Sequence, residues 1–169
     1  MNKLVALALA LILTLSLAGC GVFDSLETPA LQEGERYFEG KADFEYAESC
    51  TVSFILAADG KSVHSAKVKF VNISYELPFE GRTLSYSSGE STYTTGGSWE
   101  LGAQGHVEVN AKRYVLRITF DGDHARGEMD FFHGKFTGAQ SKQSSVFVGT
   151  YPFEATDKTE QYLSQRGGE

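Results

Sequence analysis

Residues 50–75, CTVSFILAADGKSVHSAKVKFVNISY, carry the clearest β-hairpin pattern in the chain. Every second residue from Cys50 to Leu56 is apolar, which is the period of a strand with one buried face. The pair Asp59-Gly60 then suits the positive φ angles of a tight hairpin turn. A second strand is expected from Val63 to Tyr75, so this stretch predicts two neighbouring antiparallel strands.

The second of these strands changes phase part-way along its length. Ala66, Val68 and Phe70 lie on one face, whereas the apolar residues between Val71 and Tyr75 lie on the other. A β-bulge or a sharp bend near Phe70 explains this change. Such a bend is one way in which a strand passes from one sheet to another.

Short strands are expected on both sides of this hairpin, and no segment has the pattern of a long amphipathic helix. Together they predict an all-β fold, either an antiparallel β-sandwich or a flattened barrel of about nine or ten strands. The expected strands cover residues 38–46, 50–56, 63–75, 83–87, 91–95, 98–101, 106–109, 114–120, 126–132 and 145–154.

The hairpin is similar to one found in secreted bacterial β-sandwich modules. The similarity lies in Val52-Ser53-Phe54 followed by Asp59-Gly60-Lys61-Ser62-Val63. Most such modules have no assigned activity, so the resemblance implies a sandwich fold and no particular function.

The first twenty residues have the pattern of an export signal. Lys3 supplies a positive start, and an apolar run follows from Leu4 to Leu15. This run is shorter than the roughly 20 residues that span a bilayer, which disfavours a transmembrane helix. A plain secretory signal and an uncleaved anchor remain the alternatives to the interpretation given next.

The end of this segment, Leu17-Ala18-Gly19-Cys20, resembles the lipobox of bacterial lipoproteins. The resemblance implies cleavage between Gly19 and Cys20, and modification of Cys20 with two or three acyl chains. Two or more acyl chains hold a protein firmly on a membrane. Gly21 allows sorting to the outer membrane in a Gram-negative cell; in a Gram-positive cell the anchor would be the cell membrane.

The chain divides into four parts on this interpretation. A tether containing Pro29 separates the anchor from the folded domain, and a polar, frayed tail is expected at the end. The parts are a cleaved signal at 1–19, the lipidated N-terminus and tether at 20–34, a β-sandwich domain at 35–155 and the tail at 156–169.

Composition limits the partners of the domain. The chain has a net charge of −7, and removal of Lys3 with the signal makes it one unit more negative. An acidic surface repels the phosphates of nucleic acids, which argues against nucleic acid as a partner. The same charge disfavours electrostatic attraction to an anionic membrane, so membrane lipid would be reached through acylated Cys20.

No pattern typical of catalysis, metal binding or cofactor binding occurs. We therefore expect a non-catalytic protein that holds no metal and no cofactor. Asp121, Asp123, His124 and Asp130 are the nearest approach to a metal site, but a solvated hairpin turn is the simpler interpretation. Cys50 has no partner once Cys20 is acylated, and it is expected to be an inert buried thiol rather than a link between molecules.

Residues 83–99, TLSYSSGESTYTTGGSW, are the candidate ligand-binding segment. Tyr86 and Tyr93 stand among Ser, Thr and Gly, a mixture that binding surfaces often use, although it also suits an ordinary exposed strand. We therefore expect a binding or interaction module with a glycan or an envelope protein as partner.

Two other functions remain open. One is a hydrolase of envelope polymers that uses Glu128, Asp130 or the Asp121 turn as acids; Glu76 and Glu80 form a further acidic pair. The other is a structural part of an envelope assembly that binds through an exposed strand edge.

Overall fold

The computed structural model describes residues 30–134 and 145–166. The export signal, Gly19, Cys20 and most of the expected tether lie outside the described residues. Within the described ranges, no helix is both long enough and apolar enough to cross a membrane.

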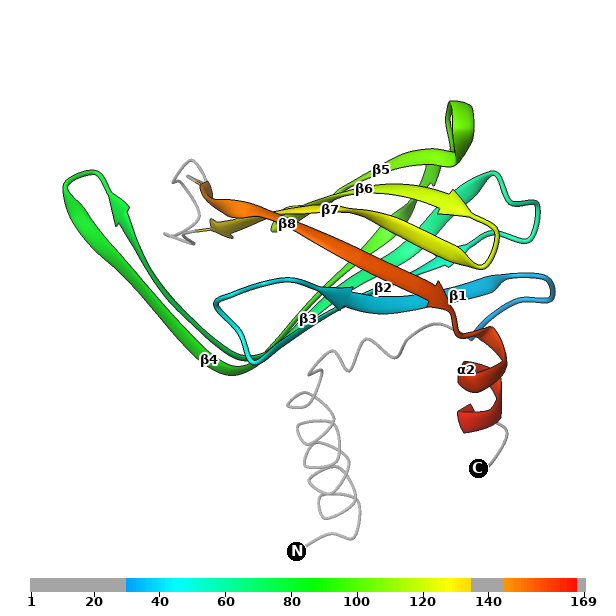
Figure 1. Cartoon of the computed structure of the whole chain (residues 1–169), viewed down its shortest axis with the longest axis horizontal. Helices are drawn as coiled ribbons and strands as arrows, with labels where there is room; N and C mark the ends of the chain where they lie inside the picture. Colours follow the sequence, from blue (N-terminus) through cyan, green and yellow to red (C-terminus); the bar gives the residue numbers. More distant parts are fainter. Residues whose placement is uncertain (1–29, 135–144, 167–169) are drawn as a thin grey trace, which may run out of the picture.

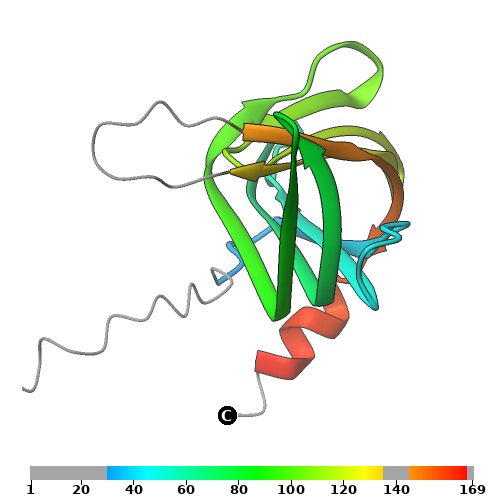
Figure 2. The same ribbon diagram turned by 90° about the vertical axis from the view of Figure 1, so that its left-hand side faces the viewer.

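The described residues form one antiparallel sheet that curls into a half-barrel (Figures 1 and 2). Its strand order is β4-β3-β2-β1-β8-β7-β6-β5, so neighbours in the sheet are neighbours in the chain except at the central β1–β8 pair. The strands are β1 (Arg36–Ala42), β2 (Ser49–Leu56), β3 (Ser62–Phe79), β4 (Arg82–Glu100), β5 (His106–Asn110), β6 (Tyr114–Asp121), β7 (His124–Gly134) and β8 (Ser145–Asp157).

The predicted all-β antiparallel fold is confirmed, but the expected nine or ten strands need correction to eight in the described residues. The segments 83–87, 91–95 and 98–101 are parts of the single strand β4. Gly89 and Gly96 do not end the strand, because β3 pairs with β4 along almost its whole length. The eight strands belong to one continuous sheet, which resembles the expected flattened barrel more than two stacked sheets.

A bend in β3 lies close to where the phase change predicted it. Asn72 has a φ of 50°, in the left-handed region. Phe70 before the bend and Ile73 after it are both fully buried in the same core. The bend therefore keeps the strand's apolar residues on the inner face of one sheet, rather than carrying the strand into a second sheet. We call residues 72–90, the part of the β3–β4 hairpin beyond the bend, the arm (Figure 1).

The core fills the concave side of the sheet and is rich in aromatic rings. Phe38, Phe54, Phe70 and Phe131 have no exposed surface. Phe70 and Phe131 come from opposite halves of the sheet, and their ring centroids are 4.9 Å apart. Each such side chain contributes on the order of 1.5–3 kcal/mol by leaving water, so the core holds the two halves together.

Two glycines allow the sharp coiling of the sheet. A Cβ atom on Gly40 would collide with the carbonyl oxygen of Glu154 on β8, and one on Gly127 would collide with that of Arg117 on β6. Only glycine lets the neighbouring backbones approach this closely. Both glycines face β8 in the sheet, Gly40 opposite Ala155 and Gly127 opposite Phe153.

The end of the chain differs from the expected frayed tail. β8 continues to Asp157, and α2 (Thr159–Arg166) follows it. The Tyr37 amide donates to Thr159 Oγ1 at 2.9 Å, and the Lys158 amide donates to the Tyr37 carbonyl at 2.8 Å. Tyr162 adds a ring contact with Tyr37, with centroids 4.5 Å apart. Residues 158–166 are polar and bury few apolar side chains. Their contacts with Tyr37 of β1 therefore hold this segment in place.

Candidate binding site: the aromatic cluster beside the arm

Tyr86 and Tyr93 both lie on the inner face of β4. Tyr86 pairs with Tyr75 of β3 within the arm, and Tyr93 pairs with Val68 just before the bend. Both side chains are half-buried and pack against the edge of the core. The sequence-predicted pair is therefore brought to one surface, although the two residues are seven positions apart.

Two further side chains complete the group that we call the aromatic cluster, namely Tyr75, Tyr86, Tyr93 and His133. Tyr75 Oη lies 2.6 Å from His133 Nδ1 on β7. The Tyr86 ring centroid is 5.4 Å from both the Tyr75 and the His133 centroids. Rings from β3, β4 and β7 thus converge where the arm leaves the half-barrel.

Tyr93 connects the aromatic cluster to the core and to a cation. Its ring centroid lies 6.0 Å from that of Phe70 and 5.8 Å from that of Phe131. On another side, the guanidinium carbon of Arg113 is 5.6 Å from the Tyr93 centroid, within the range of a cation–π contact. Arg113 belongs to the turn between β5 and β6.

The protonation of the aromatic cluster reflects burial, hydrogen bonds and this cation. Burial, reinforced by the hydrogen bond with Tyr86, raises the pKa of Tyr93 to about 12. Burial also acts to raise the pKa of Tyr86, but hydrogen bonds with Ser91 and other neighbours outweigh it, and this pKa lies below its usual value. Burial and the charge of Arg113 lower the pKa of His133. The imidazole is therefore favoured in its neutral form, in which it can accept or donate a hydrogen bond.

Sequence reasoning missed His133 and Arg113. The sequence presents His133 as one of several scattered histidines, and Arg113 as part of a polar turn. Tyr75 and His133 are 58 positions apart, and only the curl of the sheet brings them together. The apolar alternation of β7 was the one available signal, since it places His133, two residues after Phe131, on the same inner face; the register shift after Phe131 puts its extra residue on β8 and leaves this alternation intact.

The acids proposed for a hydrolase are already engaged on the outer face. Arg117 Nη1 and Nη2 donate to the two oxygens of Asp130 at 2.8 and 2.9 Å, and Thr150 Oγ1 donates to Asp130 at 2.6 Å. The hydrogen bonds from Arg117 are the main cause of a lowered Asp130 pKa. Glu128 lies 3.4 Å from the same guanidinium. A carboxylate held ionised in this way is a poor proton donor.

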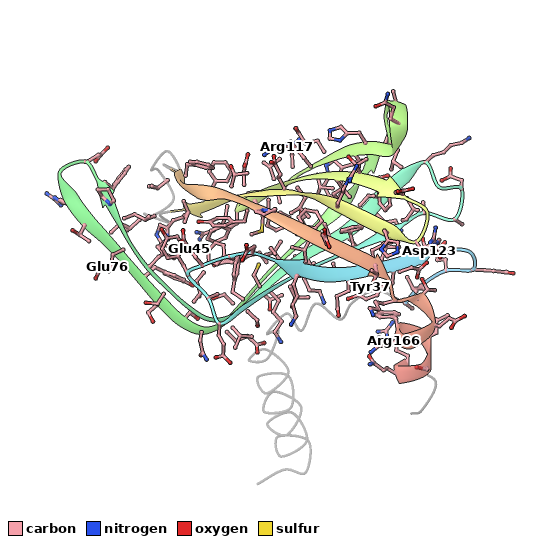
Figure 3. The ribbon with its side chains drawn as sticks, viewed as in Figure 1. Tyr37, Glu45, Glu76, Arg117, Asp123 and Arg166 are labelled. Carbon is pink, nitrogen blue, oxygen red and sulfur yellow. The ribbon has the colours of Figure 1, made fainter. Side chains whose placement is uncertain are left out.

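The acidic side chains lie in separate groups, with Glu128 and Asp130 together at Arg117 and Glu76 on the arm. Figure 3 shows Glu76 on the arm and Arg117, which forms ion pairs with Glu128 and Asp130, over β6. These positions belong to different parts of the molecule, whereas glycoside hydrolysis needs two carboxylates that face one bond.

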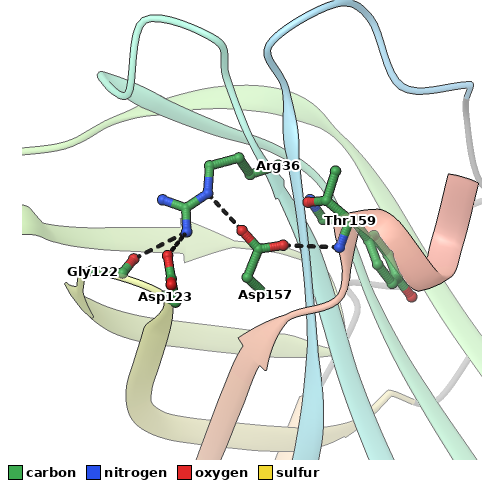
Figure 4. Close-up of polar contacts among 6 residues, drawn as sticks. Arg36, Gly122, Asp123, Asp157 and Thr159 are labelled. Carbon is green, nitrogen blue, oxygen red and sulfur yellow. Dashed lines mark hydrogen bonds and ion pairs between the residues drawn. The ribbon is translucent and has the colours of Figure 1, made fainter.

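The Asp121 turn is held by ion pairs with Arg36 (Figure 4). Arg36 Nη2 lies 2.6 Å from Asp123 Oδ1, and Arg36 Nε lies 2.6 Å from Asp157 Oδ2. Asp157 also accepts the Thr159 amide at 2.8 Å, at the start of α2. Within residues 30–134 and 145–166, no three His, Cys, Asp or Glu side chains are grouped to hold a metal ion.

Cys50 lies in the core, as its alternation predicted. Its exposed fraction is 2%, and burial raises the pKa of its thiol to about 12. A buried, protonated thiol is a poor nucleophile, which agrees with the interpretation of Cys50 as an inert packing residue.

An open groove of about 810 Å³ crosses the outer face over β1, β8 and β7. Its walls carry charges of both signs, including Lys41, Arg126, Glu39 and Glu154. Mixed charges along neighbouring strands are typical of a solvated sheet face, and this groove lacks the convergent aromatic rings found beside the arm.

Comparison of the chain with protein-family models, with curated proteins and with solved structures finds no match.

Proposed function

We propose that this protein is a lipoprotein of the bacterial cell envelope, anchored through acylated Cys20, whose half-barrel is a non-catalytic binding module. The aromatic cluster is its ligand-binding surface, and a glycan or an envelope protein is its partner. The observation that carries this proposal is the convergence of Tyr75, Tyr86, Tyr93 and His133, from three strands, beside the arm.

The chemistry of the aromatic cluster suits recognition. Tyr rings offer broad contact area at a low cost in conformational entropy, and their hydroxyls can orient a polar ligand. Tyr86 and Tyr93 are neither fully buried nor fully exposed. Ser88 and Ser91 place further hydroxyls next to Tyr86.

Binding is tested with a soluble protein comprising residues 21–169 on an array of bacterial glycans. The double variant Tyr86→Ala, Tyr93→Ala is expected to lose at least tenfold in affinity for any glycan that the parent protein binds. Tyr162→Ala, which removes a half-buried tyrosine from α2, is the matched control and should bind as the parent does. Undiminished binding by the double variant would exclude the aromatic cluster as the site.

The anchor is tested separately in cells. Cys20→Ala should abolish incorporation of a fatty-acid probe and release the protein from membranes, because no other residue in the lipobox can be acylated. Cys50→Ala is the control and should be labelled normally, since Cys50 is buried in the core. Unchanged labelling of Cys20→Ala would refute the lipoprotein assignment.

A role in an envelope assembly is the second candidate, and the exposed edge of β4 favours it. β4 has 19 residues and lies at the edge of the sheet, paired on one side with β3. Such an edge can accept a strand from another protein. A complex recovered after mild detergent extraction, and lost on Ser85→Lys with Ser87→Lys, would support this role, since edge lysines discourage strand pairing.

The hydrolase alternative has weaker support. Arg117 holds Asp130 and Glu128 in ion pairs, and Arg36 holds Asp123. An active site would have to break these pairs before the carboxylates could act on a substrate.

A further inference from the structure

Arg113 gives the aromatic cluster a positive charge in an otherwise acidic chain. The chain carries a net charge of −7. Arg113 contacts the face of Tyr93, and its charge acts on Tyr75, Tyr86 and His133 as well. Arg113 is the one permanently charged side chain among the main causes of the shifted pKa values of these four residues. Arg113 therefore places a positive charge close enough to act on all four members of the aromatic cluster.

The structure also fixes where this cation lies. A Cβ atom on Gly134 would come within 3.1 Å of the Arg113 guanidinium carbon, so the guanidinium packs directly on the backbone of β7 next to His133. The Arg113 carbonyl accepts the Phe132 amide at 2.8 Å, which ties the β5–β6 turn to the same strand. Arg113 is half-buried, so its charge is less screened than that of a fully exposed arginine.

This arrangement combines two features that acidic sugars require. A guanidinium has five N–H donors in a planar fork that matches a carboxylate, so it can keep an existing contact and still bind one. The neighbouring Tyr faces can stack on the apolar face of a sugar ring. A neutral sugar would use the rings alone, and a simple anion would use the arginine alone.

We propose that the aromatic cluster binds a saccharide that carries a carboxylate, with the carboxylate on Arg113 and the sugar ring against Tyr86 and Tyr93. This inference rests on the proposed binding function and names the ligand class for the same surface.

The test compares acidic glycans with the same glycans after methyl esterification of the carboxylate. The full-length protein, purified from membranes in detergent, is titrated with oligosaccharides containing uronic, muramic or sialic acid. At least one acid is expected to bind about tenfold or more tightly than its ester, because only the acid can form charge-assisted hydrogen bonds. This comparison needs no variant, so it remains decisive even if substitutions at Arg113 disturb folding.

Variants then assign the carboxylate to Arg113. Arg113→Gln should bind acid and ester equally, and Arg113→Lys should keep part of the preference because it retains the charge without the fork. Arg117→Gln removes the same charge from the outer face and should keep the full preference. Circular dichroism checks that each variant is folded.

The outcomes separate this inference from the proposed function. If neutral glycans bind as well as acids, and the double variant of Tyr86 and Tyr93 abolishes both, the binding function stands and the acidic ligand class is refuted. If no glycan binds the parent protein, the acidic ligand class is refuted together with the glycan partner, and the binding function then requires an envelope protein as partner. Equal binding of a penta-glutamate peptide would also overturn the inference, because charge alone would then explain recognition.

Discussion

The hydrogen bond between Tyr75 and His133 joins the arm to β7. The imidazole is half-buried, and both its burial and the charge of Arg113 disfavour the protonated form. The protonation state of His133 thus affects the stability of the fold.

The pKa of His133 predicts that stability falls at mildly acidic pH. Above pH 6.5, the usual pKa of histidine, the ring is neutral in both the folded and the unfolded chain. Below this pH the unfolded chain takes up the proton first, so the free energy of unfolding decreases until the pH reaches the lowered pKa of the folded state. Urea unfolding between pH 8 and pH 5 measures the effect. His133→Gln should reduce the slope more than the control His124→Gln, at the exposed first residue of β7. Equal slopes in all three proteins would contradict the prediction.

A second residue-scale prediction concerns the ion pair of Arg117 with Asp130. Asp130→Asn is expected to lower the free energy of unfolding at pH 7 by about 1 kcal/mol, because the side chains are only 31% and 19% exposed and share two hydrogen bonds. Glu128→Gln is the matched control. Glu128 is 59% exposed and contacts the same arginine at 3.4 Å, so its loss should cost less. The Asp130 contribution should also decrease once the pH falls below the usual carboxyl pKa, and it should be lost as the pH falls through the lowered pKa of the folded state, since protonation removes the charge that Arg117 favours. A larger loss for Glu128→Gln than for Asp130→Asn would contradict this ranking.

At the scale of single elements, the bend at Asn72 decides what the arm can do. It turns the inner faces of β3 and β4 so that Tyr75 and Tyr86 stay on the same side as the core. Without the bend, the alternation of a straight strand would place these rings on the outer face. The aromatic cluster therefore depends on one backbone angle.

Substitution at position 72 tests this dependence. Asn72→Val should destabilise the protein by about 1–2 kcal/mol relative to Asn72→Gly, because a β-branched residue is disfavoured at positive φ and glycine is not. Both variants lose the same side-chain contact with Glu48, so their difference isolates the backbone effect. Urea unfolding gives the two free energies. Similar values would mean that the bend is not held by the angle at this residue.

The strands, turns and core were largely predictable from local patterns. Alternation located the bend near Phe70, and Asp-Gly turns located two hairpins. The length of β4 was not predictable, because a strand rich in Ser and Gly is ordered by pairing with β3 rather than by its own side chains. Local composition singled out Tyr86 and Tyr93 as candidates. It gave no sign of His133 and Arg113, because distant segments meet only through the curl of the sheet. α2 was missed because backbone contacts to Tyr37, not apolar periodicity, hold its first turn.

At the scale of the whole molecule, the half-barrel is open between its two edge strands. β4 and β5 come into contact, but no ladder of hydrogen bonds joins them in the described part of the chain. The sheet centre is β1 with β8, and each of these strands is paired on both sides. Protection of the backbone should therefore decrease from the centre of the sheet toward its edges.

Hydrogen exchange followed by mass spectrometry checks this gradient. Amides of β1 and β8 are expected to exchange slowest, and those of the β4 segment within the arm fastest, because the arm extends away from the core and pairs on one side only. Strong protection of β4 in purified protein would contradict the gradient and indicate that a further strand pairs with this edge.

The central β1–β8 pair has a consequence for the order in which the protein can fold. The strands β1–β4 and β5–β8 form two hairpin-linked halves, and the ladder between β1 and β8 joins them. A chain that emerges N-terminus first from a ribosome or a membrane channel therefore cannot close its sheet until residue 157 is free. Joining the first strand to the last requires closure of a loop of nearly the whole domain, which makes folding slow. Loss of β8 would leave β1 as an exposed edge, so a truncation that removes residues 145–169 is expected to leave the N-terminal half prone to aggregation.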